Sequence, residues 1–275
     1  IDLCGLEAPA VPAPADPARD GISLAPVLRG EADAPPDRML CVNYSRMPGF
    51  LSFPSPDSEA VMRREGTAVL WKHWRLIAGA ELYDLENDPT QQTNVIADNP
   101  DVAGRMRGFL DEWWTGVEPV ANQVQRIVIG SDRENPTMLS ACEWRDVFVD
   151  QQRQVRIAAR KNSFWHLEVE RLGNYTFELR RWPRESGLKL REACSETVVT
   201  DGTMCEGVAM PIAGARMFID REWYSQDLEE EDAEAATFSV QLPAGPTTLH
   251  TWFTDERGQS LCGAYYVYVT RTESA

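Results

Sequence analysis

Long hydrophobic runs are missing from this sequence. No stretch of its 275 residues approaches the roughly 18 consecutive apolar residues that a membrane-spanning helix needs, so no membrane span is expected. Basic residues are also scarce, because 27 lysines and arginines stand against 43 aspartates and glutamates, which gives a formal charge of −16. A field of this sign repels phosphate backbones, so nucleic acid is not expected as a partner.

Familiar catalytic and metal-binding motifs are absent as well. The three histidines, His73, His166 and His250, lie far apart in the sequence, and there is no H-E-x-x-H, G-x-S-x-G or Walker motif. None of the six cysteines forms a C-x-x-C pair, which argues against a zinc knuckle or a redox motif. Cys194 and Cys205 are the closest pair, but free or structural thiols are favoured over disulfides. The residues alone therefore define no complete catalytic constellation.

The first part of the chain combines strand signals with a helix. Strands are expected over residues 38–46, over residues 68–77, where the side chains alternate, and early in residues 81–95. A short helix is expected within residues 23–29, with Gly30 positioned to end it.

A longer helix is expected to follow, with Asn99 as its N-cap and Pro100 in its first turn. One face of this helix carries the apolar residues Val102, Met106, Phe109, Leu110, Trp113 and Trp114. We expect the helix to end near Gly116, because Pro119 disfavours its continuation. Residues 1–116 are thus predicted to form a small antiparallel sheet with a packed C-terminal helix.

From residue 117 onward, short strand signals recur about every ten residues, a spacing typical of a β-sandwich. The candidates are residues 126–130, 154–159, 164–171, 174–182, 215–220, 236–242, 248–255 and 263–271. Gly173-Asn174 is the expected turn of a hairpin. Residues 117–275 are therefore predicted to form a jelly-roll-like β-sandwich, and the fold class as a whole is α+β. The polar faces of these strands show no clear row of aromatic residues.

Two sets of side chains have a possible binding role. Lys72 and His73 form a cationic pair between Trp71 and Trp74 that could meet the sulfate of an anionic sugar, although a packed strand with a lysine reaching solvent is the plainer interpretation. Arg46, at the end of the preceding expected strand, is a candidate of the same kind with the same plainer interpretation. Trp182 is interpreted either as a platform for a sugar ring or, more readily, as part of the sandwich core.

The order of the phrases in the first part carries a family resemblance. IDLCGL, DGISLAPVLRG, WKHWRLI and ELYDLENDPTQQTNV are followed by the helix that ends in two tryptophans. Residues 1–116 thereby resemble the C-terminal end of an arylsulfatase-type sulfatase of the alkaline-phosphatase-like superfamily. ELYDLENDP is the most specific phrase. After its proline, Gln91 or Gln92 stands where the family usually has a glutamate, which is a minor departure.

The resemblance implies a parent enzyme that hydrolyses sulfate esters, on sulfated small molecules or glycans. In that family a separate N-terminal domain carries a formylglycine nucleophile and a calcium ion. None of the six cysteines here lies in a C-x-P/A-x-R motif, and the calcium-binding aspartates are absent, so no catalytic or metal-binding residue is expected in this chain. The chain, which starts at Ile1, is interpreted as a fragment that is inactive alone and whose partner is the missing catalytic domain. A periplasmic or secreted location is what the family suggests.

The resemblance strengthens Arg46, Lys72 and His73 as substrate-binding candidates, because this subdomain borders the active site in the family. Two alternatives remain open: a phosphodiesterase or phosphonate hydrolase relative, and a non-catalytic carbohydrate-binding or interaction module. For residues 117–275, a brace against the catalytic domain is favoured over carbohydrate binding, since no aromatic row is evident.

Overall fold

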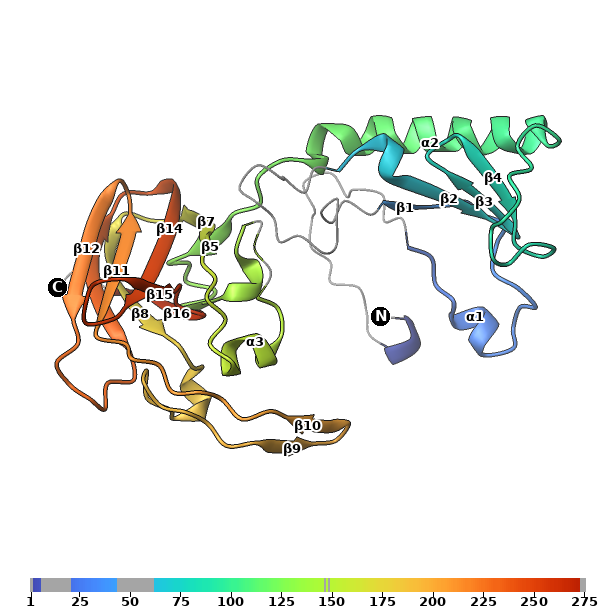
Figure 1. The fold of residues 1–275 in the computed structure, drawn as a ribbon. Helices are drawn as coiled ribbons and strands as arrows, with labels where there is room; N and C mark the ends of the chain where they lie inside the picture. The colour runs from blue at the N-terminus through green and yellow to red at the C-terminus, as the bar shows by residue number, and fades with distance from the viewer. Residues whose placement is uncertain (1, 6–20, 44–61, 146, 148, 273–275) are drawn as a thin grey trace. The chain divides into compact units, whose positions relative to one another are not determined.

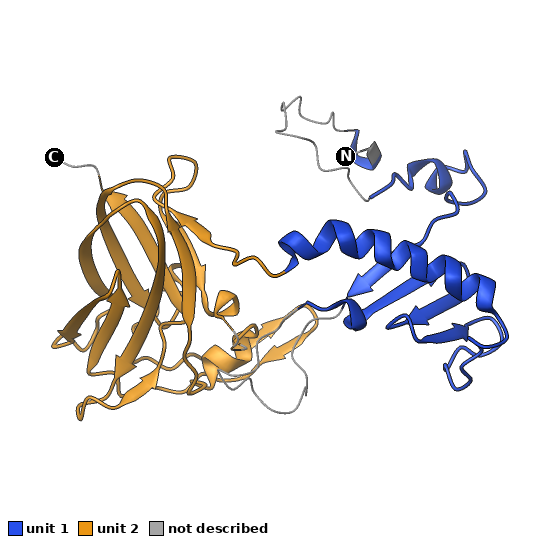
Figure 2. Cartoon of the chain, turned by 90° about the horizontal axis from the view of Figure 1, so that it is seen from above, with its two compact units in different colours: residues 1–45, 62–121 blue, residues 46–61, 122–275 orange. Residues whose placement is uncertain are grey.

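The computed structural model describes residues 2–5, 21–43, 62–145, 147 and 149–272 (Figure 1). These residues form two compact units, one ending at Ala121 and the other starting at Asn122 (Figure 2). The fold class is α+β as predicted, with antiparallel sheets, few helices and a β-sandwich. Among the described residues, no helix has the length and apolar character required to cross a bilayer.

The first unit is a four-stranded antiparallel sheet with a long helix on one face (Figure 1). Its strands follow chain order: β1 (Leu40–Asn43), β2 (Thr67–Trp71), β3 (Trp74–Ile77) and β4 (Glu81–Asp84). The predicted single strand over 68–77 is therefore wrong, because the chain reverses at Lys72 and His73. The short helix α1 (Ala25–Leu28) lies where the sequence places it, and Gly30 adopts the positive φ of a helix-ending glycine.

The long helix α2 (Pro100–Ala121) contributes Ala103, Met106 and Leu110 to the core of this unit. Opposite them lie Val69, Trp71, Leu76 and Leu82 from the sheet. The predicted end near Gly116 is wrong, since α2 continues through Pro119. A proline so near the end of a helix removes a single backbone donor, and the carbonyl that it leaves unpaired belongs to the exposed Thr115, where water can bond it.

The second unit is a sandwich of two sheets. The six-stranded sheet has the order β12-β11-β14-β7-β5, with β15 paired to β14, and only its β5–β7 pair is parallel. Its strands are β5 (Ile127–Ile129), β7 (Phe164–Val169), β11 (Gly214–Ile219), β12 (Glu222–Asp227), β14 (Gly245–Thr254) and β15 (Ser260–Cys262). The four-stranded sheet has the order β13-β8-β16-β6. It consists of β6 (Thr137–Ser140), β8 (Gly173–Arg180), β13 (Ala236–Leu242) and β16 (Tyr266–Thr272).

Both sheets contribute to one hydrophobic core. Trp165 and Phe253 belong to the six-stranded sheet and Tyr175 and Phe177 to the four-stranded one, and all four are fully buried. The Tyr175 hydroxyl donates to the carbonyl of Arg171, four residues upstream, at 2.6 Å. This is the bonding pattern of the tyrosine corner found in many β-sandwiches.

Three local predictions for the second unit have clear outcomes. The predicted strand over residues 154–159 is wrong, because helix α3 (Gln152–Arg156) occupies its start. The predicted hairpin at Gly173-Asn174 is also wrong, because β7 and β8 belong to different sheets and the link carries the chain between them. Trp182 is buried in the core, so the plainer of its two interpretations is confirmed.

One further hairpin lies outside the two sheets. Strands β9 (Thr197–Val199) and β10 (Gly202–Met204) pair with each other and are exposed at every position. All six cysteines are free thiols, and Cys262 is the one that is buried.

Candidate functional site

Lys72 and His73 form the two-residue loop between β2 and β3. Trp71 and Trp74, which flank the loop, are the last pair of residues opposite each other on the two strands. Lys72 has a φ of 54°, in the left-handed region that non-glycine residues seldom adopt. The backbone N–H of Leu85 donates to the carbonyl of His73 at 2.8 Å. The loop that follows β4 is thereby tied to the turn, and it brings acidic side chains beside the histidine.

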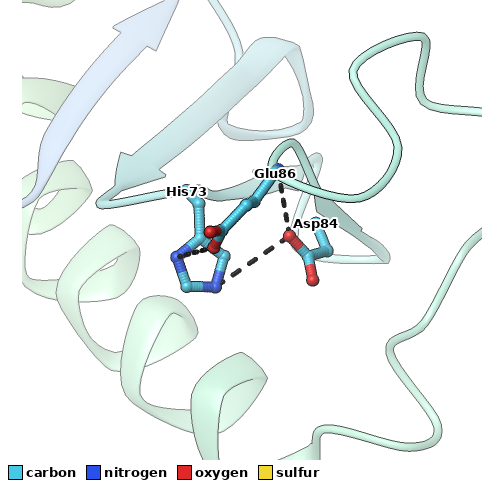
Figure 3. A group of neighbouring side chains, drawn as sticks. All are labelled: His73, Asp84 and Glu86. Carbon is cyan, nitrogen blue, oxygen red and sulfur yellow. Dashed lines mark hydrogen bonds and ion pairs between the residues drawn. The ribbon is translucent and has the colours of Figure 1, made fainter.

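The imidazole of His73 lies between two carboxylates (Figure 3). Its Nε2 is 4.0 Å from Oδ1 of Asp84, and its Nδ1 is 3.8 Å from Oε2 of Glu86. The ring also lies against Trp74, with 4.6 Å between the ring centroids. A positive charge on His73 is therefore compensated locally, which weakens its attraction for an external anion.

Asp84 is held in its ionised form by its neighbours. The Asn87 side chain donates to Oδ2 at 2.8 Å, and the Glu86 backbone N–H donates to Oδ1 at 3.0 Å. The hydrogen bond from Asn87, followed by the backbone bonds and the charge of His73, lowers the pKa of Asp84 against an opposing effect of desolvation. The aspartate thus serves both to fix the loop and to face the histidine.

One imidazole and two carboxylates also make a set of potential metal ligands, since the ligand atoms of His73, Asp84 and Glu86 lie within 4.8 Å of one another. Calcium prefers oxygen ligands alone, whereas imidazole suits zinc and other transition metals. This group is therefore unlike the calcium site that the family resemblance places in a different domain.

Lys72 engages a different carboxylate. Its Nζ lies 3.6 Å from Oδ2 of Asp37 and 5.2 Å from the centroid of the Trp71 ring. The other oxygen of Asp37 accepts a hydrogen bond of 2.9 Å from Nε1 of Trp71, and the guanidinium of Arg105 lies 4.3 Å from the centroid of the same ring. Of the predicted neighbours, Trp71 lies beside Lys72, while the cation Arg105 and the anion Asp37 were not predicted.

A pocket of about 570 Å³ lies beside Lys72. Ile22, Leu24 and Leu40 supply apolar lining, and Arg38 and Lys72 supply two basic groups beside Asp37. His73 is not among the residues that line it. The structure therefore separates two neighbours that the sequence groups together: Lys72 borders a pocket, and His73 belongs to the acidic cluster. Arg46, the third predicted residue, lies outside the described residues.

A second candidate surface was missed by the sequence analysis, which expected no aromatic row on the sandwich. That expectation is wrong, because Trp223, Phe218, His250 and Phe164 occupy directly opposed positions on β12, β11, β14 and β7. Each strand contributes one or two outward rings, so the row appears only when the strands are aligned. The usable signal was the aromatic residues that alternate with the buried ones along each strand.

Comparisons with known proteins leave the family open. No protein-family model matches the sequence, and no curated protein matches it. Among solved structures, the chain is similar to a ruminal GH26 endo-β-1,4-mannanase with 9% identity and a TM-score of 0.28, over 52% of this chain and 27% of that one. The chain thus spans about a quarter of the length of that structure, and so weak a likeness carries no argument.

Proposed function

We propose that this chain is the C-terminal portion of a sulfatase that hydrolyses sulfate esters of carbohydrates. In this proposal the first unit borders the active site of a separate catalytic domain, which supplies the formylglycine and the calcium ion, and the sandwich is an accessory domain. The observation that carries the proposal is the ordered series of sulfatase-like phrases, above all DGISLAPVLRG and ELYDLENDP.

The structure gives these phrases a physical role that supports the resemblance. In ELYDLENDP, the first four residues are strand β4, and Oδ2 of Asp88 accepts the backbone N–H groups of Gln92 and Thr93 at 2.7 and 2.8 Å. Downstream, Oδ1 of Asn94 accepts a hydrogen bond from the backbone N–H of Leu82 at 3.0 Å. This bond holds the end of the loop against strand β4. The phrase thus consists of residues that build one particular strand and loop, which gives them a structural role in this chain, and the proposal assigns the chemistry to the catalytic domain.

The pocket beside Lys72 is the part of the first unit best suited to a sulfated substrate. Lys72 and Arg38 offer positive charge, and Ile22, Leu24 and Leu40 offer apolar surface for the rest of a bound molecule. Asp37 competes for Lys72, so a sulfate group would have to share or displace that ion pair. We therefore assign substrate contact to Lys72 ahead of His73.

The first test concerns the reading frame and its product. We expect the coding sequence upstream to contain, in frame, a C/S-x-P/A-x-R motif, and the complete protein to release sulfate from sulfated saccharides in a calcium-dependent way. The 275-residue chain alone should release none. An upstream frame without the motif, or a complete protein that cleaves phosphodiesters and leaves sulfate esters intact, would overturn the proposal.

The second test concerns Lys72 in the complete enzyme. Lys72→Ala should lower kcat/KM on a sulfated saccharide about fivefold to tenfold, because a partly exposed charge contact contributes about 1 kcal/mol. Arg257→Ala, which removes an exposed cation from the sandwich, is the matched control and should leave kcat/KM unchanged. Equal values for wild type and Lys72→Ala would remove Lys72 from the site.

A further inference from the structure

The outward face of the six-stranded sheet carries a continuous set of aromatic rings, which we call the aromatic row. Four of its rings, Trp223, Phe218, His250 and Phe164, lie opposite one another in register on four adjacent strands. Successive ring centroids lie 5.0 Å apart for Phe218 and Trp223 and 6.1 Å apart for Phe164 and His250.

Two further rings widen the row. Trp252 lies 5.0 Å from Trp223 and 4.0 Å from His250, and His166 lies 5.1 Å from Phe164. Neighbouring strands are about 4.8 Å apart, so the four strands give the row a length of about 14 Å. That length accommodates more than one sugar ring.

The row lies on the face of the sheet opposite the core. On β7 and β14 the ring positions alternate with buried residues such as Trp165, Leu167 and Leu249. Trp223 is 62% exposed. So large an exposed indole adds nothing to the core, and the other five rings are half-buried beside it, which makes Trp223 the ring most open to a ligand.

The rings of the row add little charge of their own, although the cation Arg216 lies in register with Trp252. Burial lowers the pKa of His250 to about 4, so this imidazole is neutral at neutral pH and adds no positive charge among the rings. The faces of aromatic rings are weakly negative, which complements the weakly positive C–H groups on the face of a sugar ring. The chain as a whole carries a formal charge of −16 and repels polyanions.

Polar groups flank the rings where sugar hydroxyls would lie. Arg216 and Ser225 face each other on β11 and β12, and Thr248 occupies β14 one outward position from His250. Among the described residues, the one aliphatic side chain beside the row is the exposed Val128 on β5, which pairs with Glu168 of β7. Aromatic faces with hydrogen-bonding groups around them suit a carbohydrate.

We propose that the aromatic row binds the sugar rings of a neutral polysaccharide chain. The rings stack on the sugar faces, and the flanking polar side chains bond the hydroxyl groups. This inference stands on the sandwich alone, so it holds or fails independently of the sulfatase proposal. Polysaccharide binding replaces the structural brace against the catalytic domain as the proposed role of the second unit. The brace was favoured because the sequence showed no aromatic row.

The test uses the whole 275-residue chain in native affinity gels and in isothermal titration. The probes are hydroxyethylcellulose, galactomannan and laminarin as neutral polysaccharides, with dextran sulfate as the anionic comparison. Trp223→Ala is the primary variant, because its exposed side chain can be removed without opening the core. Trp252→Ala is the second variant, and Trp114→Ala, on helix α2 of the other unit, is the matched control.

We expect at least one neutral polysaccharide to retard the wild-type chain. Trp223→Ala and Trp252→Ala should each raise the Kd about tenfold or more, because each variant loses one ring that stacks on the ligand. Trp114→Ala should bind with the wild-type Kd. Three outcomes would each overturn the proposal: no retardation by any neutral polysaccharide, binding to dextran sulfate alone, or binding that Trp223→Ala leaves unchanged.

Discussion

Gly130 is a residue at which the sandwich tolerates little change. It follows β5 with a φ of 75°, a conformation that L side chains seldom adopt. A Cβ atom at this position would collide with the ring of Tyr175, and that ring is fixed by the hydrogen bond from its hydroxyl to Arg171. Glycine is therefore required here both for its backbone freedom and for its lack of a side chain.

Gly130→Ala should lower the free energy of unfolding of the sandwich by about 3 kcal/mol, from backbone strain together with overpacking. Gly187→Ala is the matched control, because Gly187 has a φ of 63° but no atom within 4 Å of the added Cβ. The control should lose only about 1 kcal/mol, from strain alone. Urea unfolding of both variants measures the difference, and equal losses would contradict the proposed collision with Tyr175.

His250 makes the stability of the sandwich depend on pH. Burial lowers its pKa from 6.5 to about 4 in the folded state, and the rings of Phe164 and Trp252 flank it. Between these two values the unfolded chain binds a proton that the folded chain does not, so stability is full above pH 6.5 and falls as the pH drops toward 4.

His250→Gln should flatten that dependence, because glutamine does not titrate. The measurement is the urea midpoint of wild type and variant at about pH 7 and about pH 5, on either side of the ordinary pKa of histidine. We expect a smaller loss on acidification in the variant. If the urea midpoint of the variant fell as much as that of wild type, the pH dependence of stability would belong to groups other than His250.

At the scale of elements, the helix α2 and its sheet share a small core in which each large side chain matters. Leu110 is fully buried, whereas Val120 on the same helix is 55% exposed. Leu110→Ala should destabilise the first unit by about 3 kcal/mol through the lost burial and the cavity left behind, and Val120→Ala should have little effect.

Hydrogen exchange with mass spectrometry locates these effects. Leu110→Ala should speed exchange in β2, β3, β4 and α2, while the strands of the sandwich, which have a core of their own, keep their protection. Uniform acceleration across both units would show that the two cores do not respond separately.

The elements also show how far the sequence could lead. The helix start at Asn99 and most of the buried face of α2 were predictable, because capping and periodicity are local signals, although Trp114 lies outside the core and the buried Ala103 was missed. The break between β2 and β3 was not, since Lys72 and His73 carry none of the glycine or asparagine that marks a tight turn, and the alternation runs through them. The carboxylates around His73 were not predictable, and the alternation along single strands could indicate outward rings but not their alignment into a row, because both features depend on which strands lie side by side.

At the scale of the whole molecule, the α+β class and the two-part organisation were predictable from a change of pattern near residue 117, and the observed boundary falls at Ala121. The formal charge of −16 bears differently on the two proposed ligands. A neutral polysaccharide approaches the aromatic row without electrostatic cost. A sulfated substrate, by contrast, depends on the local positive charge of Lys72 and Arg38 at short range, since salt screens the wider field.

The position of β16 has a consequence for biosynthesis. This strand, the last of the sandwich, lies inside the four-stranded sheet and pairs with both β8 and β6. The ribosome delivers it after every other strand, so β6 has no partner in that sheet and β8 has only β13 until residue 272 has emerged. A nascent chain therefore holds an incomplete four-stranded sheet until β16 has emerged. Chains truncated before β16 should therefore leave part of the inner face of the sandwich uncovered, and such exposed apolar surface is what chaperones and proteases bind.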